Sequence, residues 1–351
     1  MTAQKIIVLG TGGTIAGTAA SSGDHTGYTA AQLSVADLLR EVPGMSDALR
    51  GDELHSEQVA QLDSKDMDFA TMTRLAQRCA HHLAQVDVRG IVITHGTDTL
   101  EETAYFLHLL LGAACAELIA QKPVVLTCAM RPATSSEADG PRNLRDAVIV
   151  ARDALHSGGQ ARGVLAVCAG DVHHAAHVQK IHSFALNAFS SGDVALGEAG
   201  VVARVEQGNV LWNSYAESIF KQNEPLPDIN TVQSAHYLIA SASPEEIQWP
   251  RIEIVLNHAN QTGSIVLALL ATSTKDDLLR GIVVAGTGNG TMSDSIEKAL
   301  QEARQAGVEV VIASRCVWSE QTGLTGAPLR LSVVKQRVAL SLQYAVAHKT
   351  S

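Results

Sequence analysis

Short runs of aliphatic and β-branched residues recur along the chain, and each is followed by a glycine or polar turn and then by a longer segment with helical spacing. Continuous apolar strands that alternate with helices are typical of a parallel sheet covered on both faces. The pattern therefore predicts an α/β fold with a mainly parallel sheet flanked by helices. The runs expected to form strands are 5–9, 90–94, 123–128, 163–168, 252–256, 281–285 and 308–313.

Two of the expected helices carry capping signals. Thr99 and Glu102, three residues apart, form a capping-box pattern at the start of a helix expected at 99–111. Ser293 or Asp294 is expected to cap a second helix in the C-terminal part of the chain.

The pattern changes in a polar stretch that contains Pro225, Pro227, Pro244 and Pro250. Because such stretches commonly join domains, we expect a linker at 215–250. This divides the chain into a larger N-terminal α/β domain, 1–214, and a smaller C-terminal α/β domain, 251–351, which has a parallel sheet of its own.

The composition indicates a globular protein that acts on small molecules or other proteins. Of its 351 residues, 46% are hydrophobic and only 4% aromatic, which predicts an aliphatic core. The 26 basic and 36 acidic residues give a net charge of -10, so nucleic acid and anionic membranes are not expected partners. The longest apolar stretch, 107–116, contains His108 and is shorter than the roughly 20 residues that a membrane-spanning helix needs.

The five cysteines are widely spaced and form no Cys-x-x-Cys pair: Cys79, Cys115, Cys128, Cys168 and Cys316. This usage favours buried free thiols in a reducing compartment. The apolar run 6–9 is too short for the core of a secretory signal. We therefore expect a cytoplasmic protein, although a mature form whose leader had been removed would have the same sequence.

Glycine-rich turns follow the first strand and a late strand, but neither fits a nucleotide-binding motif. Ile15 stands where the third glycine of Gly-x-Gly-x-x-Gly would be, and the same test fails at 286–291. The turns at 10–17 and 94–99 instead place threonine hydroxyls at the carboxyl ends of strands, the edge at which open α/β sheets bind ligands. For one such turn alone, helix capping is the commoner role.

The turns accumulate in an order that resembles the bacterial-type L-asparaginases of the asparaginase/glutaminase family, over nearly the whole chain from Lys5 to about Ala345. The matching segments are 11–17 (TGGTIAG), 27–29 (GYT), 63–67 (DSKDM), 95–105 (HGTDTLEETAY), 129–132 (AMRP) and 138–141 (ADGP), followed by Lys180.

The resemblance assigns roles in the hydrolysis of a side-chain amide, which needs a nucleophile, a proton carrier and donors to the oxyanion. Thr14 resembles the nucleophile that forms an acyl-enzyme and releases ammonia, and Tyr28 resembles its activating partner. The second hydrogen-bonded set is Thr97, Asp98 and Lys180, and the main-chain amide of Ala129 would help to hold the oxyanion. No metal or other cofactor is expected.

The resemblance also implies residues that bind the two charged groups of the zwitterionic substrate. Asp98 would pair with the α-ammonium, and Ser64 with nearby amides would bind the α-carboxylate. Lys65 replaces the glutamine of many members, and its charge is expected either to strengthen carboxylate binding or to change the choice between asparagine and glutamine.

In this family a neighbouring subunit completes the site, which implies a homotetramer built from two tight dimers. Asn260 matches the residue that reaches across. The acidic residue that some members supply from the neighbour has no clear counterpart, and Glu320 is only a candidate.

The segment before Lys180 is rich in histidine, with His173, His174 and His177. A strand at 163–168 followed by a loop would not bring residues i and i+4 together, and no glutamate lies between them as in a zinc motif. We therefore expect a solvated loop without a metal. His95, in a turn, is expected to pack or to form hydrogen bonds.

The leading hypothesis is a cofactor-free L-asparaginase, and three alternatives stay open. The first is a relaxed glutaminase-asparaginase, although Lys65 favours asparagine. The second is the subunit that supplies ammonia for transamidation of charged tRNA, which the net charge and the lack of a domain before Lys5 disfavour. The third is a catalytically silent amino-acid-binding protein of the same fold.

Overall fold

The computed structural model describes residues 3–24, 27–40, 42–153, 163–193, 200–221, 229–241, 243–317 and 331–345. The chain divides into two compact units. The first consists of Met1–Asn223 and Leu238–Pro244, and the second of Glu224–Tyr237 and Glu245–Ser351. The stretch 215–250, expected to be a linker, holds the helices α7 (Ala216–Lys221) and α8 (Ile229–Ala240).

The first unit is built on an eight-stranded sheet with the order β10-β9-β6-β5-β4-β3-β1-β2. The five strands from β5 to β2 are parallel, and β6, β9 and β10 are antiparallel. The bounds are β1 Lys5–Gly12, β2 Glu53–Leu62, β3 Val88–Thr94, β4 Val124–Thr127, β5 Val164–Cys168, β6 Asp171–His174, β9 Ala203–Glu206 and β10 Asn209–Trp212. The predicted α/β class and its parallel strands are confirmed.

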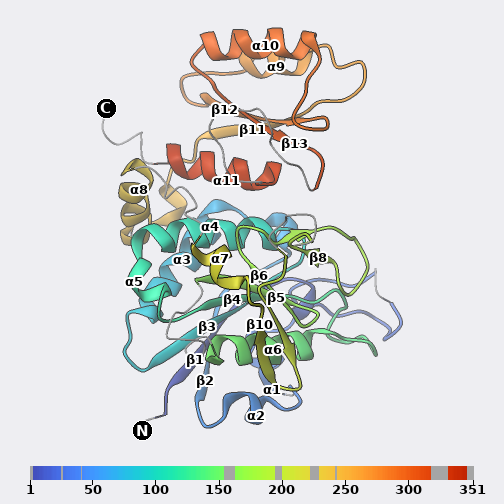
Figure 1. Cartoon of the computed structure of the whole chain (residues 1–351), viewed down its shortest axis with the longest axis vertical. Coiled ribbons are helices and arrows are strands. Elements are labelled where there is room, and N and C mark those ends of the chain that lie inside the picture. The colour runs from blue at the N-terminus through green and yellow to red at the C-terminus, as the bar shows by residue number, and fades with distance from the viewer. Residues whose placement is uncertain are drawn as a thin grey trace. The chain divides into compact units, whose positions relative to one another are not determined.

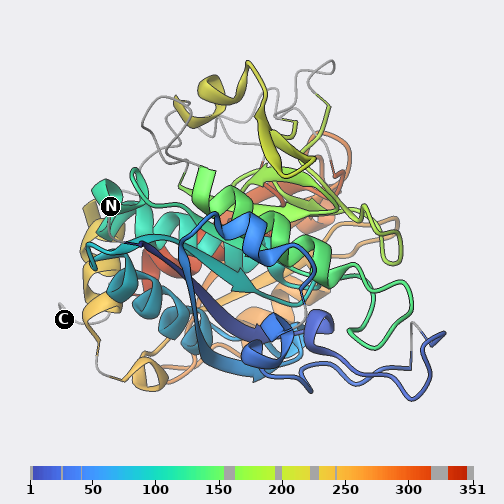
Figure 2. The ribbon, with the colours of Figure 1, turned by 90° about the horizontal axis from the view of Figure 1, so that it is seen from below.

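Helices cover both faces of this sheet (Figure 1). On one face, α6 (Gly140–Asp153) packs with α1 (Val35–Arg40) and α2 (Met45–Leu49) over a buried aliphatic cluster. Seen from below, α6 (green) lies over the strands (Figure 2). The remaining helices are α3 (Phe69–Leu83), α4 (Leu100–Ala114) and α5 (Ala116–Ile119).

Helix α4 begins where the sequence predicts it, but its capping box does not form. Thr99 is the N-cap residue and makes no side-chain cap hydrogen bond. Its hydroxyl instead donates to the main-chain oxygen of Ser64, 2.8 Å away. The threonine therefore joins two turns of the sheet edge rather than closing its own helix.

The prediction of a loop after residue 168 is wrong, because the chain turns back directly into β6. The turn is made by Ala169 (φ 53°) and Gly170 (φ 86°), and β6 pairs antiparallel with β5. As a result His173 and His174 are 1% and 5% exposed rather than solvated.

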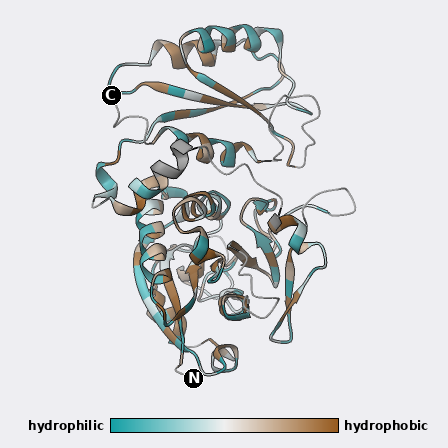
Figure 3. Ribbon diagram, turned by 60° about the vertical axis from the view of Figure 1, so that its left-hand side comes forward, coloured by the Kyte–Doolittle hydropathy of each residue, from teal (hydrophilic) through white to brown (hydrophobic). Residues whose placement is uncertain are grey.

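The second unit has a three-stranded parallel sheet, β11-β12-β13, formed by Arg251–Leu256, Leu279–Gly286 and Glu309–Ser314. Helices α9 (Ser264–Ala271) and α10 (Asp294–Gln305) share a buried cluster on one side, and α11 (Val333–Tyr344) packs against both β11 and β12. Ser293 caps α10 by accepting a hydrogen bond from Ile296 N. Figure 3 shows hydrophobic residues along the strands.

The cysteines only partly follow the expectation of burial. Cys79, Cys128 and Cys168 are buried and Cys316 is exposed, and all five are free thiols. The Sγ atoms of Cys128 and Cys168 lie 3.4 Å apart at the ends of β4 and β5. Within the described residues, no helix is both long and apolar enough to cross a membrane.

Candidate active site

The two threonine turns meet at the carboxyl edge of the first-unit sheet, where β1 and β3 end. The β1 register shifts between Gly10 and Gly12, and Gly12 and Gly13 have φ values of 101° and 80°, a region that favours glycine. A methyl group on Gly13 would overlap the backbone of Gly96. The turns therefore pack backbone against backbone, which brings Thr14 and Thr97 to the same place.

Thr14 and Tyr28 are in direct contact. The Thr14 Oγ1 and the Tyr28 hydroxyl oxygen lie 2.7 Å apart, and Thr14 is only 7% exposed. The β-bridge between Thr18 and Thr29 anchors the segment that carries the tyrosine. A methyl group on Gly17 would lie 2.9 Å from the Tyr28 ring, so glycine at this position allows the ring to approach. The structure thus gives the threonine hydroxyl a hydrogen-bond partner in the Tyr28 hydroxyl.

Thr97, Asp98 and Lys180 form a second connected set. Lys180 Nζ donates to Thr97 Oγ1 at 2.8 Å and to Asp98 Oδ1 at 2.7 Å. Lys180 lies on β7 (Gln179–Lys180), which pairs with β8 (Phe189–Ser190), and its main-chain N–H donates to Glu101 Oε2. Thr97 is buried, whereas the side chain of Asp98 is 55% exposed. The carboxylate is therefore the member of this set that is open to a ligand.

Ser64 is tied to this set and Lys65 is not. Ser64 is 2% exposed, and its Oγ accepts a hydrogen bond from Asp98 N at 3.2 Å. Lys65 is exposed and forms a short ion pair with Asp66 in the same turn. The structure therefore brings Ser64 to the site, while a neighbouring carboxylate already partners the ammonium of Lys65.

Ala129 follows β4 and is buried against the first threonine turn. It forms a small apolar cluster with Ile15 and Ala16. The next two main-chain N–H groups, of Met130 and Arg131, donate to the carboxylate of Asp139. Asp139 stands out in the sequence only as part of the matching segment 138–141, and the buried Asn143 beside it was not predicted. Its signal in the sequence is a polar residue within the apolar pattern of α6.

Two predicted residues are not part of this arrangement. Asn260 belongs to the second unit, where it is exposed with a φ of 61°, so its role across a subunit interface stays a prediction. Glu320 lies outside the described residues.

The histidines have structural contacts in the interior of the first unit. His173 Nδ1 lies 2.9 Å from Ser191 Oγ, and the ring of His174 packs edge-on against that of His108. His95 is fully buried, its Nδ1–H donates to the Gly96 carbonyl at 2.7 Å, and burial lowers its pKa to about 4. In the part of the chain that the structure describes, no group of three or more His, Cys, Asp or Glu side chains is arranged to hold a metal.

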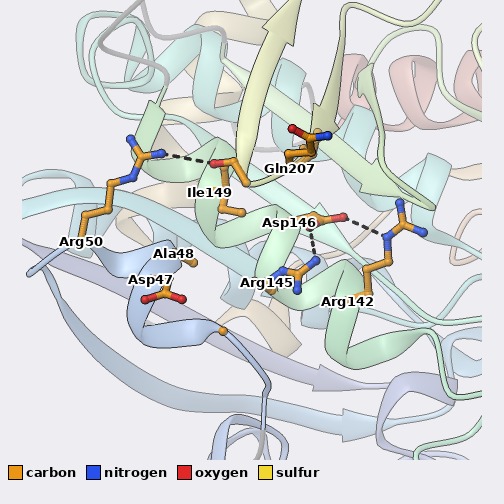
Figure 4. A pocket seen from close by; sticks show the side chains of 11 residues that line it. Asp47, Ala48, Arg50, Arg142, Arg145, Asp146, Ile149 and Gln207 are labelled. Carbon is orange, nitrogen blue, oxygen red and sulfur yellow. Dashed lines mark hydrogen bonds and ion pairs between the residues drawn. The ribbon is translucent and has the colours of Figure 1, made fainter.

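A cavity of about 530 Å³ lies elsewhere in the first unit, between α2, α6 and the β9–β10 turn (Figure 4). Four of its charged groups already have partners: Asp146 pairs with Arg142 and Arg145, and Arg50 donates to the Gly208 carbonyl. None of the predicted site residues lines it. We therefore assign the sheet edge, and not this cavity, as the candidate active site.

Comparison with known proteins agrees with this architecture. Residues 5–217 match the family model described as Asparaginase, N-terminal, and residues 251–334 match the Glutaminase/Asparaginase C-terminal domain. The class is therefore that of the two-domain α/β amidohydrolases. The chain belongs to the asparaginase/glutaminase family.

Proteins similar to this chain include some named as L-asparaginases and some named as glutaminase-asparaginases. The chain is 34% identical to the L-asparaginase 2 of Bacillus subtilis, over 89% of this chain and 72% of that protein. It is 33% identical to the glutaminase-asparaginase of Pseudomonas fluorescens, over 88% and 75%. A crystal structure of a probable cytoplasmic L-asparaginase from Campylobacter jejuni matches with a TM-score of 0.76 at 30% identity, covering 99% of this chain and 96% of the other. A probable periplasmic L-asparaginase from Haemophilus influenzae is 35% identical over 89% of this chain.

Proposed function

We propose that this protein hydrolyses L-asparagine to L-aspartate and ammonia, with Thr14 as the nucleophile. The observation that carries the proposal is the 2.7 Å contact between Thr14 Oγ1 and the Tyr28 hydroxyl, next to the set formed by Thr97, Asp98 and Lys180. Threonine is a weak nucleophile until a neighbouring group takes its proton, and Tyr28 is in reach to do so.

The proposed reaction has two halves. The Tyr28 hydroxyl takes the Thr14 proton and passes its own proton to the amide nitrogen while Oγ1 attacks the side-chain carbonyl carbon, and the Ala129 main-chain N–H stabilises the oxyanion. The C–N bond then breaks and ammonia leaves. A water molecule hydrolyses the acyl-enzyme, releasing the aspartate and returning a proton to Thr14 Oγ1. Thr97 and Lys180 orient the groups that take part in this second half.

The substrate's charged groups are matched by Asp98 and Ser64. The exposed carboxylate of Asp98 pairs with the α-ammonium. Ser64 Oγ already accepts from Asp98 N, which leaves its hydroxyl proton to donate to the α-carboxylate. Lys65 contributes little to this binding, because Asp66 already pairs with its ammonium.

Glutamine is the second candidate substrate, because a similar protein is named a glutaminase-asparaginase. One methylene separates the two amides, a difference usually worth only about 1–3 kcal/mol in a binding pocket. The ratio of kcat/KM for the two amino acids decides between a selective and a relaxed enzyme.

We also propose a homotetramer in which Asn260 completes the neighbour's site. Exposed apolar side chains on β11 and α9 support an association surface on the second unit: Leu256 is 50% exposed, Ile265 45% and Leu267 43%. Light scattering after size exclusion measures the mass. Asn260→Ala should lower turnover without changing that mass.

Cell fractionation tests the cytoplasmic location that the sequence predicts.

The deciding experiment compares ammonia and aspartate production by the wild type and by Thr14→Ala, with each amino acid supplied separately. Thr73→Ala is the matched control, because it also removes a buried threonine hydroxyl, one that donates to the main-chain oxygen of Phe69. The proposal requires turnover in the wild type and the control and none in Thr14→Ala. Undiminished turnover in Thr14→Ala would exclude this nucleophile, and asparagine binding without aspartate formation would indicate a silent binding protein.

A further inference from the structure

Asn143, on α6, makes hydrogen bonds with every donor of its side-chain amide. It is 2% exposed. Its Nδ2 donates to the Cys128 carbonyl at 2.9 Å and to Asp139 Oδ2 at 3.1 Å, and its Oδ1 accepts from Ala169 N at 3.1 Å. Because carbonyl and carboxylate oxygens only accept, these partners fix which end of the amide carries the N–H groups.

The bond to the Cys128 carbonyl bears directly on Ala129. The carbonyl of Cys128 and the N–H of Ala129 belong to one planar trans peptide group and point in opposite directions. A donor that holds the carbonyl therefore also fixes the direction of the N–H. It polarises the peptide as well, which makes that N–H a stronger donor.

A second set of hydrogen bonds holds the main chain on the other side of Ala129. Asp139 accepts from Met130 N at 3.1 and 3.0 Å and from Arg131 N at 2.9 Å. Asn143 connects the two sets of hydrogen bonds, because the Nδ2 that donates to the Cys128 carbonyl also donates to Asp139. Its Oδ1 ties this assembly to Ala169, at the end of the neighbouring strand β5. The Ala129 peptide is thus fixed from both sides, by the half-buried carboxylate of Asp139 and by the buried amide of Asn143.

We propose that Asn143 is a positioning residue for amide hydrolysis: it aims and polarises the Cys128–Ala129 peptide so that the Ala129 N–H meets the developing oxyanion. This inference rests on the function proposed above. A displacement of about 1 Å at a reacting centre can cost about 100-fold in rate. Loss of the Asn143 donor should therefore lower kcat while substrate binding stays intact.

The test measures kcat and KM for Asn143→Ala and Asn143→Asp at a temperature where circular dichroism shows each variant folded. Both should lose about 10- to 100-fold in kcat, with KM within about threefold of the wild type. Asn143→Asp is nearly isosteric and keeps the acceptor for Ala169 N. It has no N–H group, and the proton that it shares with the neighbouring Asp139 carboxylate lies between the two carboxyl groups, which leaves the Cys128 carbonyl without its donor. It carries the test alone if Asn143→Ala does not fold.

Asn213→Ala is the matched control, because Asn213 Nδ2 also donates to a main-chain carbonyl in the first unit, that of Val201. It should lose stability and keep kcat. An aldehyde analogue of the substrate, which forms a tetrahedral adduct on a nucleophilic hydroxyl, should bind Asn143→Asp more weakly by the factor lost in kcat. Binding of the product L-aspartate should not change, and a merely structural role would not separate the two ligands.

The outcomes also separate this inference from the proposed function. Wild-type turnover that disappears in Thr14→Ala but stays within threefold in both Asn143 variants would overturn the positioning role alone. A wild type that hydrolyses neither amide overturns both. Equal losses in kcat and in affinity for L-aspartate would assign Asn143 to general site integrity and so reject the inference.

Discussion

Gly13 and Gly96 pack backbone against backbone where β1 and β3 end. A methyl group on Gly13 would overlap the Cα and N atoms of Gly96, and one on Gly96 would overlap the Ser64 side chain. Each glycine directly precedes a threonine of the candidate site, Thr14 or Thr97. The contact therefore sets how closely the two threonine turns approach, and neither turn has room for a side chain at this point.

Gly13→Ala is expected to abolish turnover and to lower the free energy of unfolding by several kcal/mol, because it combines overlap with an unfavourable φ of 80°. Gly51→Ala is the matched control. Its φ is 95°, but a methyl group there meets nothing within 4 Å, so only about 1–2 kcal/mol should be lost and turnover kept. Denaturant unfolding and ammonia release measure both effects. Equal destabilisation by the two variants would contradict the role of the glycine contact.

Tyr28→Phe should lower kcat by about 100- to 10,000-fold with little change in fold, because it removes the hydroxyl 2.7 Å from Thr14 Oγ1. Tyr215→Phe removes a hydroxyl that donates to the Val201 carbonyl, away from the site, and should leave kcat within threefold. Steady-state kinetics on asparagine compares them. If Tyr28→Phe kept wild-type turnover, another group would have to accept the Thr14 proton.

The stability of the first unit should fall as the pH is lowered from about 6.5 to about 4, because of His95. Burial lowers its pKa in the folded protein to about 4, against an ordinary value of 6.5. Between these values the unfolded chain binds a proton that the folded chain does not, so the free energy of unfolding decreases as the pH falls. The full shift corresponds to about 3 kcal/mol.

His95→Asn should flatten this pH dependence, because the asparagine amide can replace the Nδ1–H donor to the Gly96 carbonyl and has no proton to gain. Denaturant midpoints between pH 4 and 7 measure the slope for both proteins. An unchanged slope in the variant would assign the acid sensitivity to other groups.

Lys65→Gln is expected to change the ratio of asparagine to glutamine kcat/KM by less than about threefold. The Lys65 side chain is 61% exposed and already paired with Asp66, and exposed ion pairs contribute little. Asp66→Asn is the informative second variant, since it leaves the ammonium only the more distant Asp63 carboxylate, 3.9 Å away, and should lower KM. A large change in selectivity on Lys65→Gln would restore the role in substrate choice that the sequence suggested.

The sequence was sufficient to predict the buried parallel strands of the first unit. Strands β1, β3, β4 and β5 are covered on both faces, so they read as uninterrupted apolar runs. Strand β2 lies at the sheet edge and alternates between partly buried and exposed residues, and its polar composition hid it. Strand β6 was hidden by its histidines, which are buried because the strand lies inside the sheet and helices cover it: His174 packs on His108 of α4 and on Phe220 of α7.

The sequence by itself determined the fold class and the family motifs, and it selected Thr14, Tyr28, Lys180 and their neighbours as candidate site residues, because these depend on local composition and order along the chain. Only the tertiary structure decided which of these groups touch. The Ser64 contact with Asp98 and the hydrogen bond from Asn143 to the Cys128 carbonyl join residues that different strands and helices bring together. Such contacts follow from packing across the sheet edge, which no local pattern encodes.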